Sequence, residues 1–333
     1  MRPRGGRLGE DGVKQTLLCG VDLGGTKLSV GLVRPDGTLV DKAVVYDHTQ
    51  KNEEDICLQI RDMVRELLEK QRIGEADIRG VGIGFAGHLR FAEGVVITTS
   101  NFPRFKMKNF PIRQMVQQYF GVPVIVDNDA NAQSFAEFLF GAGSAYDTMI
   151  FLTVSTGIGA GLVLNRRIFR GTTGTAGEFG HTIVNPHSDI RCGCGNYGCL
   201  MSHASGLALP QLIRKKLKQG TKTQLQVTDS TKIDGEFVKQ GLEAGDPLCR
   251  SVVLEYADYI GIGVYNLFQI FNPPVIVLGG GLMNWGSVYF ERIKKKFYSL
   301  AGDMLHDPIE ITLARTGRDT GLIGAAALLL EEP

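Results

Sequence analysis

The sequence carries no strong excess of either charge. It has 333 residues and a formal net charge of +1. Binding to nucleic-acid phosphates usually needs a strongly basic face, so we do not expect nucleic acid as the main partner. No apolar run approaches the roughly 18 residues that span a membrane, which argues against a membrane partner. No apolar stretch follows the basic start of the chain, so we expect residues 1–14 to be a disordered tail and not a signal peptide.

Cysteines are also few, and half of them lie together. Six cysteines, of which Cys192, Cys194 and Cys199 fall within eight residues, fit a reducing cytoplasm better than a secreted disulfide scaffold. Three thiolates and the imidazole of His181 form a complete ligand set for tetrahedral zinc. The alternatives are inert buried thiols, which do not cluster in this way, or a disulfide, which leaves an odd thiol. We predict a structural Zn²⁺ that fixes the direction of Glu178 and His181.

Two glycine-rich turns are similar to each other. The first, LGGTK, follows an expected strand over residues 17–22, and the second, STGIGAG over residues 155–161, follows one over residues 149–154. Glycines let backbone N–H groups approach phosphate oxygens closely, and Asp22 suits Mg²⁺ held through water. The second turn is neither a Walker loop nor a dinucleotide fingerprint. A plain hairpin turn is the alternative for the first, but the repetition predicts two related halves that face each other across a cleft.

A run of polar residues, DNDAN at 127–131, follows an expected buried strand over residues 123–126 and begins a helix that runs to about residue 140. Helix capping is the alternative explanation, but a cap needs one residue and four of these five are polar. In α/β proteins, ligands bind at the carboxyl ends of strands, so we favour a ligand site. Asn101 lies in a polar loop and suits a polyhydroxylated ligand, although an ordinary turn asparagine explains it equally well.

The remaining segments alternate between strands and helices, which predicts an α/β fold. Three adjacent glycines end one strand, and the last helix is rich in small residues that allow close packing. We expect further strands over residues 28–33, 79–85, 95–98, 162–165, 275–278 and 309–313, and helices over residues 52–70, 111–119, 206–218, 234–243 and 247–271.

These motifs resemble the ROK family (repressor, open reading frame, kinase) of bacterial sugar kinases. The resemblance covers nearly all of residues 17–330 and rests on GVDLGGTK, DNDANA, TVSTGIGAGLV, EFGH with CGCGNYGC, NPPVIVLGGGL and DTGLIGAAA. It implies the actin-like, hexokinase-like fold, with two α/β domains around a central cleft. We expect one domain over residues 15–127 plus 318–333, and a second over residues 128–317 that contains the zinc loop 181–199.

The resemblance implies ATP-dependent transfer of a phosphoryl group to a sugar hydroxyl, which we expect to be the 6-hydroxyl of a hexose. The family's general base falls on Asp129, which would accept the proton of the attacking hydroxyl. His181 would face zinc with one ring nitrogen and the sugar with the other. The expected sugar-binding residues are Gly87, Asn101, Asn128, Asp129, Glu178 and His181. The expected residues around ATP and Mg²⁺ are Asp22, Gly24, Gly25, Thr26, Lys27, Thr156, Gly157, Gly280 and Gly281.

Two departures from the family pattern concern the sugar. Family kinases usually carry Cys-x-Glu after the last cysteine, with the glutamate on sugar hydroxyls near the anomeric carbon, but this chain has Met201, which cannot accept hydrogen bonds as strongly. His203 is a candidate to compensate. His88 stands close to where the family often has a Pro-Gly pair, and is either a further donor to the sugar or a surface histidine. We therefore expect glucose to be a poor substrate.

Several alternatives remain open at this stage. Glucokinase is the default activity, and kinases for N-acylated hexosamines, mannose, fructose or amino sugars are alternatives. A repressor of the same family would need a DNA-binding motif longer than the roughly 16 residues before the first strand. A sugar sensor without activity is a third possibility. By analogy we expect a cytoplasmic homodimer or homotetramer, whereas the choice between ATP and polyphosphate as donor is not determined by the sequence.

Overall fold

The computed structural model describes residues 16–25, 27–46, 52–99 and 107–332. Two five-stranded sheets dominate the fold, and they have the same topology. In each, three antiparallel strands are extended by two parallel ones. The first sheet has the order β3 (Leu39–Tyr46), β2 (Lys27–Val33), β1 (Leu17–Leu23), β4 (Ile78–Phe85), β8 (Val124–Asn128). The second has the order β11 (Arg167–Ile168), β10 (Ile158–Leu164), β9 (Met149–Val154), β12 (Val275–Gly279), β13 (Glu310–Leu313).

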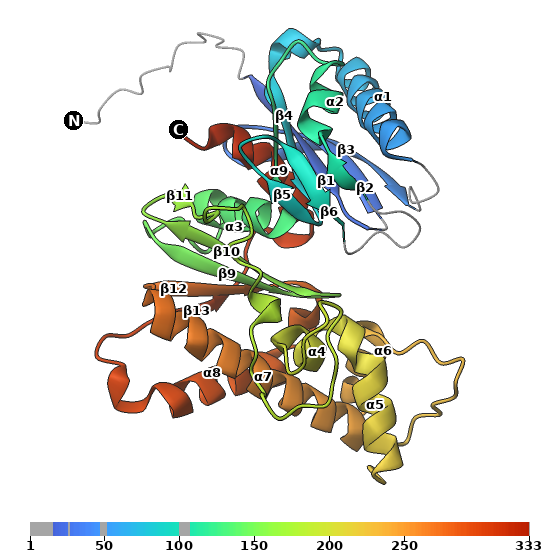
Figure 1. The fold of residues 1–333 in the computed structure, drawn as a ribbon, viewed down its shortest axis with the longest axis vertical. Helices are drawn as coiled ribbons and strands as arrows, with labels where there is room; N and C mark the ends of the chain where they lie inside the picture. The colour runs from blue at the N-terminus through green and yellow to red at the C-terminus, as the bar shows by residue number, and fades with distance from the viewer. Residues whose placement is uncertain (1–15, 26, 47–51, 100–106, 333) are drawn as a thin grey trace, which may run out of the picture.

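Helices separate and cover the two sheets (Figure 1). A small third sheet also projects from the first half. The helices are α1 (Glu53–Gln71), α2 (Ile112–Gln117), α3 (Asp129–Phe140), α4 (Leu200–Ala204), α5 (Leu209–Lys218), α6 (Gly235–Glu243), α7 (Pro247–Phe271), α8 (Ser287–Ala301) and α9 (Thr320–Ala327). The small sheet consists of β5 (His88–Arg90), β6 (Val95–Thr98) and β7 (Lys108–Phe110).

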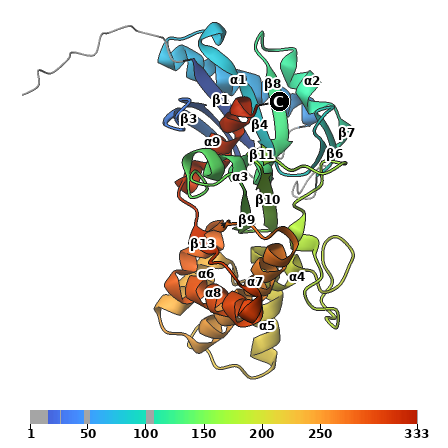
Figure 2. The same ribbon diagram turned by 90° about the vertical axis from the view of Figure 1, so that its left-hand side faces the viewer.

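The apolar faces of these elements divide the interior into layers. Helices α1 and α2 pack on the outer face of the first sheet, and α7 and α8 pack on the outer face of the second. Helices α3 and α9 lie between the two sheets, where both views of the ribbon place them (Figures 1 and 2). The last helix therefore returns to the first half of the chain, as the sequence predicts.

Glycines let the two central helices approach their neighbours at backbone distance. A Cβ at Gly82 of β4 would overlap the carbonyl oxygen of Ala325 in α9, and a Cβ at Gly324 would overlap the carbonyl oxygen of Ala132 in α3. A side chain at either position would push the layers apart. The small-residue helix expected from the sequence thus packs against the first sheet and against α3.

The second glycine turn is shorter than the sequence predicts. We expected a turn over residues 155–161 and a strand over residues 162–165, but β10 begins at Ile158. Gly161 lies within this strand, and a Cβ there would overlap the side chain of Ser134 in α3. The glycine is required for close helix packing and not for a turn, which is why composition alone misplaced the boundary.

The other expected elements are present with small shifts at their ends. The helix expected over residues 111–119 is shorter, and the helix expected from residue 206 begins at Leu209 after a 3₁₀ turn. Within the described residues, no helix is both long and apolar enough to cross a membrane. The expected domain boundaries stay a prediction.

Candidate active site

The polar residues at the β8–α3 junction, residues 127–131, have different roles. Asn128 is the helix cap: its Oδ1 accepts from the backbone N–H of Ala130 (2.8 Å), and its Nδ2 donates to the carbonyl oxygen of Gly87 (3.2 Å). Asp127 and Asn131 are buried and hydrogen-bond to each other. The capping explanation is therefore right for Asn128, and Asp129 is left as the half-buried carboxylate of the first helical turn.

Asp129 has the properties of a base that works near neutral pH. Its Oδ1 accepts the backbone N–H of Ala130 (3.0 Å), and no side chain among the described residues donates to it. Burial, with further contributions from the charges of Asp22 and Glu178, raises its pKa to about 7. A general base with a pKa near the working pH combines a useful ionised fraction with a strong drive to accept a proton.

Asp22 brings the first glycine turn close to this carboxylate. It is the last residue but one of β1 and lies next to the start of α9, where a Cβ at Gly321 would lie 2.9 Å from the Asp22 Cγ. Its Oδ2 pairs with the Lys27 amine at 3.2 Å, and the N–H of Gly24 donates to the carbonyl of Lys27 (3.0 Å) to close the hairpin. The expected Thr26 and Asn101 lie outside the described residues.

The second glycine turn meets the three glycines, residues 279–281, at the end of β12. Strands β9 and β12 are parallel neighbours, so Thr156 and Gly157 lie at the same edge of the sheet as Gly280 and Gly281. Gly280 has φ +91°, and a Cβ there would overlap Val154. The turn and the glycines therefore lie side by side at one edge of the sheet, where backbone without side chains can approach a phosphate-bearing ligand closely.

Sequence reasoning missed the segment that braces the second turn. The N–H groups of Gly206 and Leu207 donate to the carbonyl oxygens of Ser155 (2.8 Å) and Thr156 (3.1 Å). Leu207 is nevertheless 66% exposed beside the turn. The expectation of a helix from residue 206 concealed this contact.

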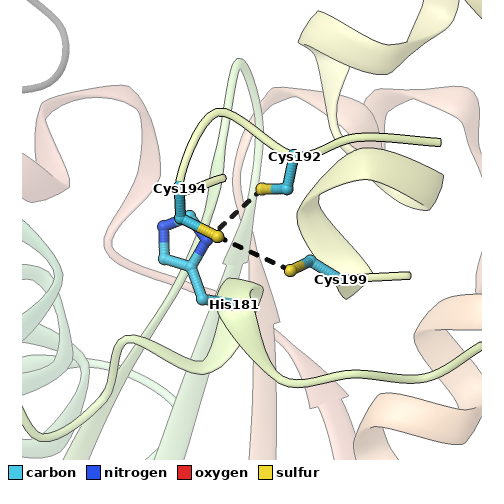
Figure 3. A group of neighbouring side chains, drawn as sticks. All are labelled: His181, Cys192, Cys194 and Cys199. Carbon is cyan, nitrogen blue, oxygen red and sulfur yellow. Dashed lines mark hydrogen bonds between the residues drawn. The ribbon is translucent and has the colours of Figure 1, made fainter. Parts of the chain in front are cut away.

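The cysteine cluster forms as predicted (Figure 3). One ligand atom from each of His181, Cys192, Cys194 and Cys199 lies within 4.8 Å of the others. Cys192 Sγ is 3.5 Å from His181 Nδ1, and Cys194 Sγ is 3.7 Å from Cys199 Sγ. The four residues thus surround one point.

Glu178 connects this cluster to the small sheet. Its Oε2 lies 3.9 Å from His181 Nε2, and its Oε1 lies 3.4 Å from His88 Nε2. The hydrogen bond from His88 is matched by a raised pKa of that imidazole. His88 is therefore not an isolated surface histidine, and it contacts a residue expected to bind the sugar.

Met201 and His203 point in different directions. The Met201 Sδ accepts the N–H of Ile158 (3.3 Å) and packs against the second glycine turn. The ring of His203 is 6% exposed and stacks on Tyr259 of α7, with centroids 4.5 Å apart. His203 is therefore held against Tyr259 of α7, whereas Met201 lies on the second glycine turn, and a compensating role for His203 stays a prediction.

Comparison with known proteins agrees with this arrangement. The sequence profile of the ROK family matches residues 18–332. The chain belongs to the ROK family. It has the actin-like, hexokinase-like fold of the structures it resembles.

Relatives of this ROK protein include kinases and regulators. It is 31% identical to a glucokinase of Halalkalibacterium halodurans, covering 94% of each chain. It is 33% identical to a xylose repressor of Caldicellulosiruptor bescii, covering 84% of this chain and 69% of the repressor. A ROK glucokinase from Streptomyces griseus, solved in complex with glucose and AMPPNP, superposes with a TM-score of 0.79 at 32% identity, covering 94% of this chain and 98% of that one.

The environment of Asp129 predicts a pH-dependent effect on stability. The folded protein holds its proton up to a pH of about 7, whereas an unfolded aspartate releases it near 4. Ionising Asp129 is therefore harder in the folded protein than in the unfolded one, and this difference lowers the stability as the pH rises from about 4 to about 7. We expect Asp129→Asn to stabilise the protein more at pH 8 than at pH 5, by about 1 to 2 kcal/mol once partial exposure is considered.

Urea denaturation at both pH values measures this difference. The control is Asp147→Asn, since Asp147 is an exposed partner of Arg166 and its removal should have the same small effect at both pH values. An equal gain from Asp129→Asn at pH 5 and pH 8 would contradict the proposed environment of this carboxylate.

Proposed function

We propose that this protein is an ATP-dependent sugar kinase that phosphorylates a hexose hydroxyl, which we take to be the 6-hydroxyl. The observation that supports it best is Asp129, a carboxylate with a pKa of about 7 that stands close to Asp22 of the first glycine turn. The identity to glucokinases over almost the whole chain supports the same activity. Domain limits at 15–127 plus 318–333 and at 128–317 are part of this proposal.

The residues suggest a division of work in the reaction. Asp129 accepts the proton of the sugar hydroxyl as its oxygen attacks the terminal phosphorus of ATP. Glu178 and Asn128 orient the sugar, and the glycine turns at Gly25 and Gly157 bind the phosphates through backbone N–H groups. Little covalent chemistry is needed, because phosphoryl transfer is accelerated mainly by positioning and by stabilisation of charge.

Magnesium fits the carboxylate of the first turn. Asp22 offers an oxygen ligand with a partly exposed side chain, 20% accessible, next to the glycines of the turn. Mg²⁺ favours such a site, because it prefers oxygen ligands and keeps part of its water shell. When bound, it would neutralise charge on the ATP phosphates.

Zinc fits the cysteine cluster. Tetrahedral zinc with Zn–S bonds of about 2.3 Å implies S···S separations of about 3.8 Å, and a slightly shorter S···N separation. The separations of 3.7 Å and 3.5 Å match these values. With all four positions filled by protein, the metal would be structural, and it would fix the segment that carries Glu178 and His181.

We expect one zinc per chain, measured by elemental mass spectrometry. Cys192→Ser should lose the metal and lower the melting temperature, since structural zinc contributes directly to folding. The matched control is Cys249→Ala, a buried cysteine away from the cluster, which should keep one zinc. Stoichiometric zinc in Cys192→Ser would show that the cluster is not the site.

Coupled release of ADP over a panel of hexoses, hexosamines and N-acetylhexosamines tests the kinase activity. We expect one acceptor to give rapid turnover and Asp129→Asn to lower kcat by about 10²- to 10⁴-fold, because the base is lost. Asp147→Asn, an exposed surface change, should keep the wild-type rate. Absence of sugar-dependent ADP release from wild-type protein would contradict the proposal.

Met201 bears on the identity of the acceptor. Its thioether is half-buried against Gly157 and Gly180 and cannot serve as a strong acceptor for sugar hydroxyls. We propose that glucose is a poor substrate and that the preferred acceptor is another hexose, with an N-acylhexosamine, mannose, fructose or an amino sugar as candidates. An acetamide methyl would find an apolar neighbour in this side chain.

Met201→Glu tests this assignment directly. A charged acceptor for a hydroxyl is worth roughly 1.5 to 3 kcal/mol, so kcat/KM for glucose should rise by about tenfold or more. Met201→Leu keeps an apolar side chain of similar volume without a carboxylate, and it should not raise glucose turnover. Efficient glucose turnover by the wild type would remove the proposed role of Met201.

A second candidate is a sugar-binding regulator without turnover. The 33% identity to a xylose repressor favours it. Binding of a sugar without release of ADP would support this function, and thermal shifts measured on the same panel would detect it.

A further inference from the structure

The guanidinium of Arg170 joins four separate parts of the chain behind the candidate site. Its Nε donates to Asp127 Oδ2 (2.7 Å), and its two terminal nitrogens pair with both carboxylate oxygens of Glu331, near the end of the chain. Its plane lies over the ring of Phe91, with the Cζ 3.7 Å from the centroid. Arg170 itself follows β11, so the second sheet is tied to β8, to the turn after β5 and to the C-terminal segment.

The partner of Arg170 acts directly on the β8–α3 junction. Asp127 is 2% exposed, and its Oδ1 accepts the backbone N–H of Asn128 (2.7 Å) and the side-chain amide of Asn131 (3.0 Å). Because both oxygens of Asp127 are bound, its carboxylate is held in one orientation. Its hydrogen bond with the Asn128 N–H then fixes the backbone at Asn128. The hydroxyl of Ser134 continues the chain of contacts by donating to the carbonyl of Asn131 (2.8 Å).

We propose that Arg170 is a positioning residue for the acceptor side of the site. It fixes Asp127, and Asp127 fixes the junction from which Asn128 and Asp129 project. Arg170 does not touch the reacting groups, and its role rests on the proposed kinase activity.

The surroundings of Arg170 and Asp127 explain why the pair orients the β8–α3 junction and does not only stabilise the fold. A buried ion pair contributes little net stability compared with apolar residues of similar volume, but removal of one partner leaves an unpaired buried charge. Burial raises the pKa of Asp127, and the Arg170 charge opposes that rise. The planar fork of arginine binds Asp127 and Glu331 at fixed angles, which a lysine cannot do.

The contact with Phe91 extends the same network to the small sheet. Phe91 follows β5, the strand that carries His88, and His88 contacts Glu178. A Cβ at Gly174 would overlap the carbonyl oxygen of Leu89, so the loop after Arg170 also packs directly on β5. Arg170 is therefore linked to the Asp129 backbone through Asp127. It also packs on Phe91, next to the strand β5 whose His88 contacts Glu178.

The test compares Arg170→Met with the double variant Arg170→Met/Asp127→Asn. We expect the single variant to melt at a lower temperature and to lose about 10- to 100-fold in kcat, since misplacement of about 1 Å has effects of this size. The KM for ATP should change by less than about twofold, because Arg170 contacts Asp127, Glu331 and Phe91 and none of these belongs to the glycine turns. Arg170→Lys should restore only part of kcat.

The double variant separates positioning from stability. It removes the unpaired charge at residue 127 and leaves only Glu331, whose side chain is 14% exposed, without its arginine, so most of the loss in melting temperature should be recovered. Its kcat should stay low, because the side chain at residue 127 keeps its contacts with Asn128 and Asn131 but loses the arginine that orients it. Recovery of kcat together with the melting temperature would overturn the proposal. If Arg170→Met does not fold, the double variant alone decides the question.

Two controls complete the design. Arg166→Met removes an exposed arginine four residues away, whose partner Asp147 is also exposed, and should change neither kcat nor stability. Wild-type protein measured alongside distinguishes the two proposals. No sugar-dependent ADP release by the wild type contradicts the kinase activity and the positioning role with it, whereas an active wild type and a fully active double variant contradict the positioning role alone.

Discussion

Contact between the backbones of α3 and α9 is the constraint on which the rest of this structure depends. The two helices lie between the sheets, and glycine at 324 allows α9 to approach the carbonyl of Ala132 in α3. Gly82 and Gly161 allow the helices to approach the first and second sheets in the same way. Because this layer is thin, the start of α3, which carries Asp129, comes close to the end of β1, which carries Asp22.

That proximity has an electrostatic cost, and this cost favours the role of base that we propose for Asp129. Burial disfavours the ionised form of Asp129, and the charges of Asp22 and Glu178 disfavour it further. A fold selected for stability alone would avoid three carboxylates at one place. The base proposed at Asp129 needs such surroundings for a pKa near neutral, and the large apolar cores on the outer faces of the two sheets stabilise the fold that holds these carboxylates together.

Two rigid clusters hold the remaining groups in place. The cysteine cluster fixes the segment that carries Glu178 from one side, since His181 belongs to both. The buried pair of Arg170 and Asp127 fixes the β8–α3 junction from the other side. Between them lies His88 of the small sheet, in contact with Glu178. Residues that are far apart in the sequence thus act on the same few side chains, which is typical of sites in which positioning accounts for most of the rate.

The sequence by itself determined the α/β fold, the repeated glycine turns and the ligand set of the cysteine cluster, whereas Asp129 became the candidate base through the resemblance to the ROK family. These features are local, because ligand spacing, strand patterning and turn chemistry depend on neighbours in the chain. Only the tertiary structure showed the role of Gly161, which leaves room for Ser134 of α3 to pack against β10. It also turned His203 toward Tyr259 and paired Asp127 with Arg170. Each of these depends on a contact between residues distant in sequence, and the identity of a residue does not specify which distant neighbour it will meet.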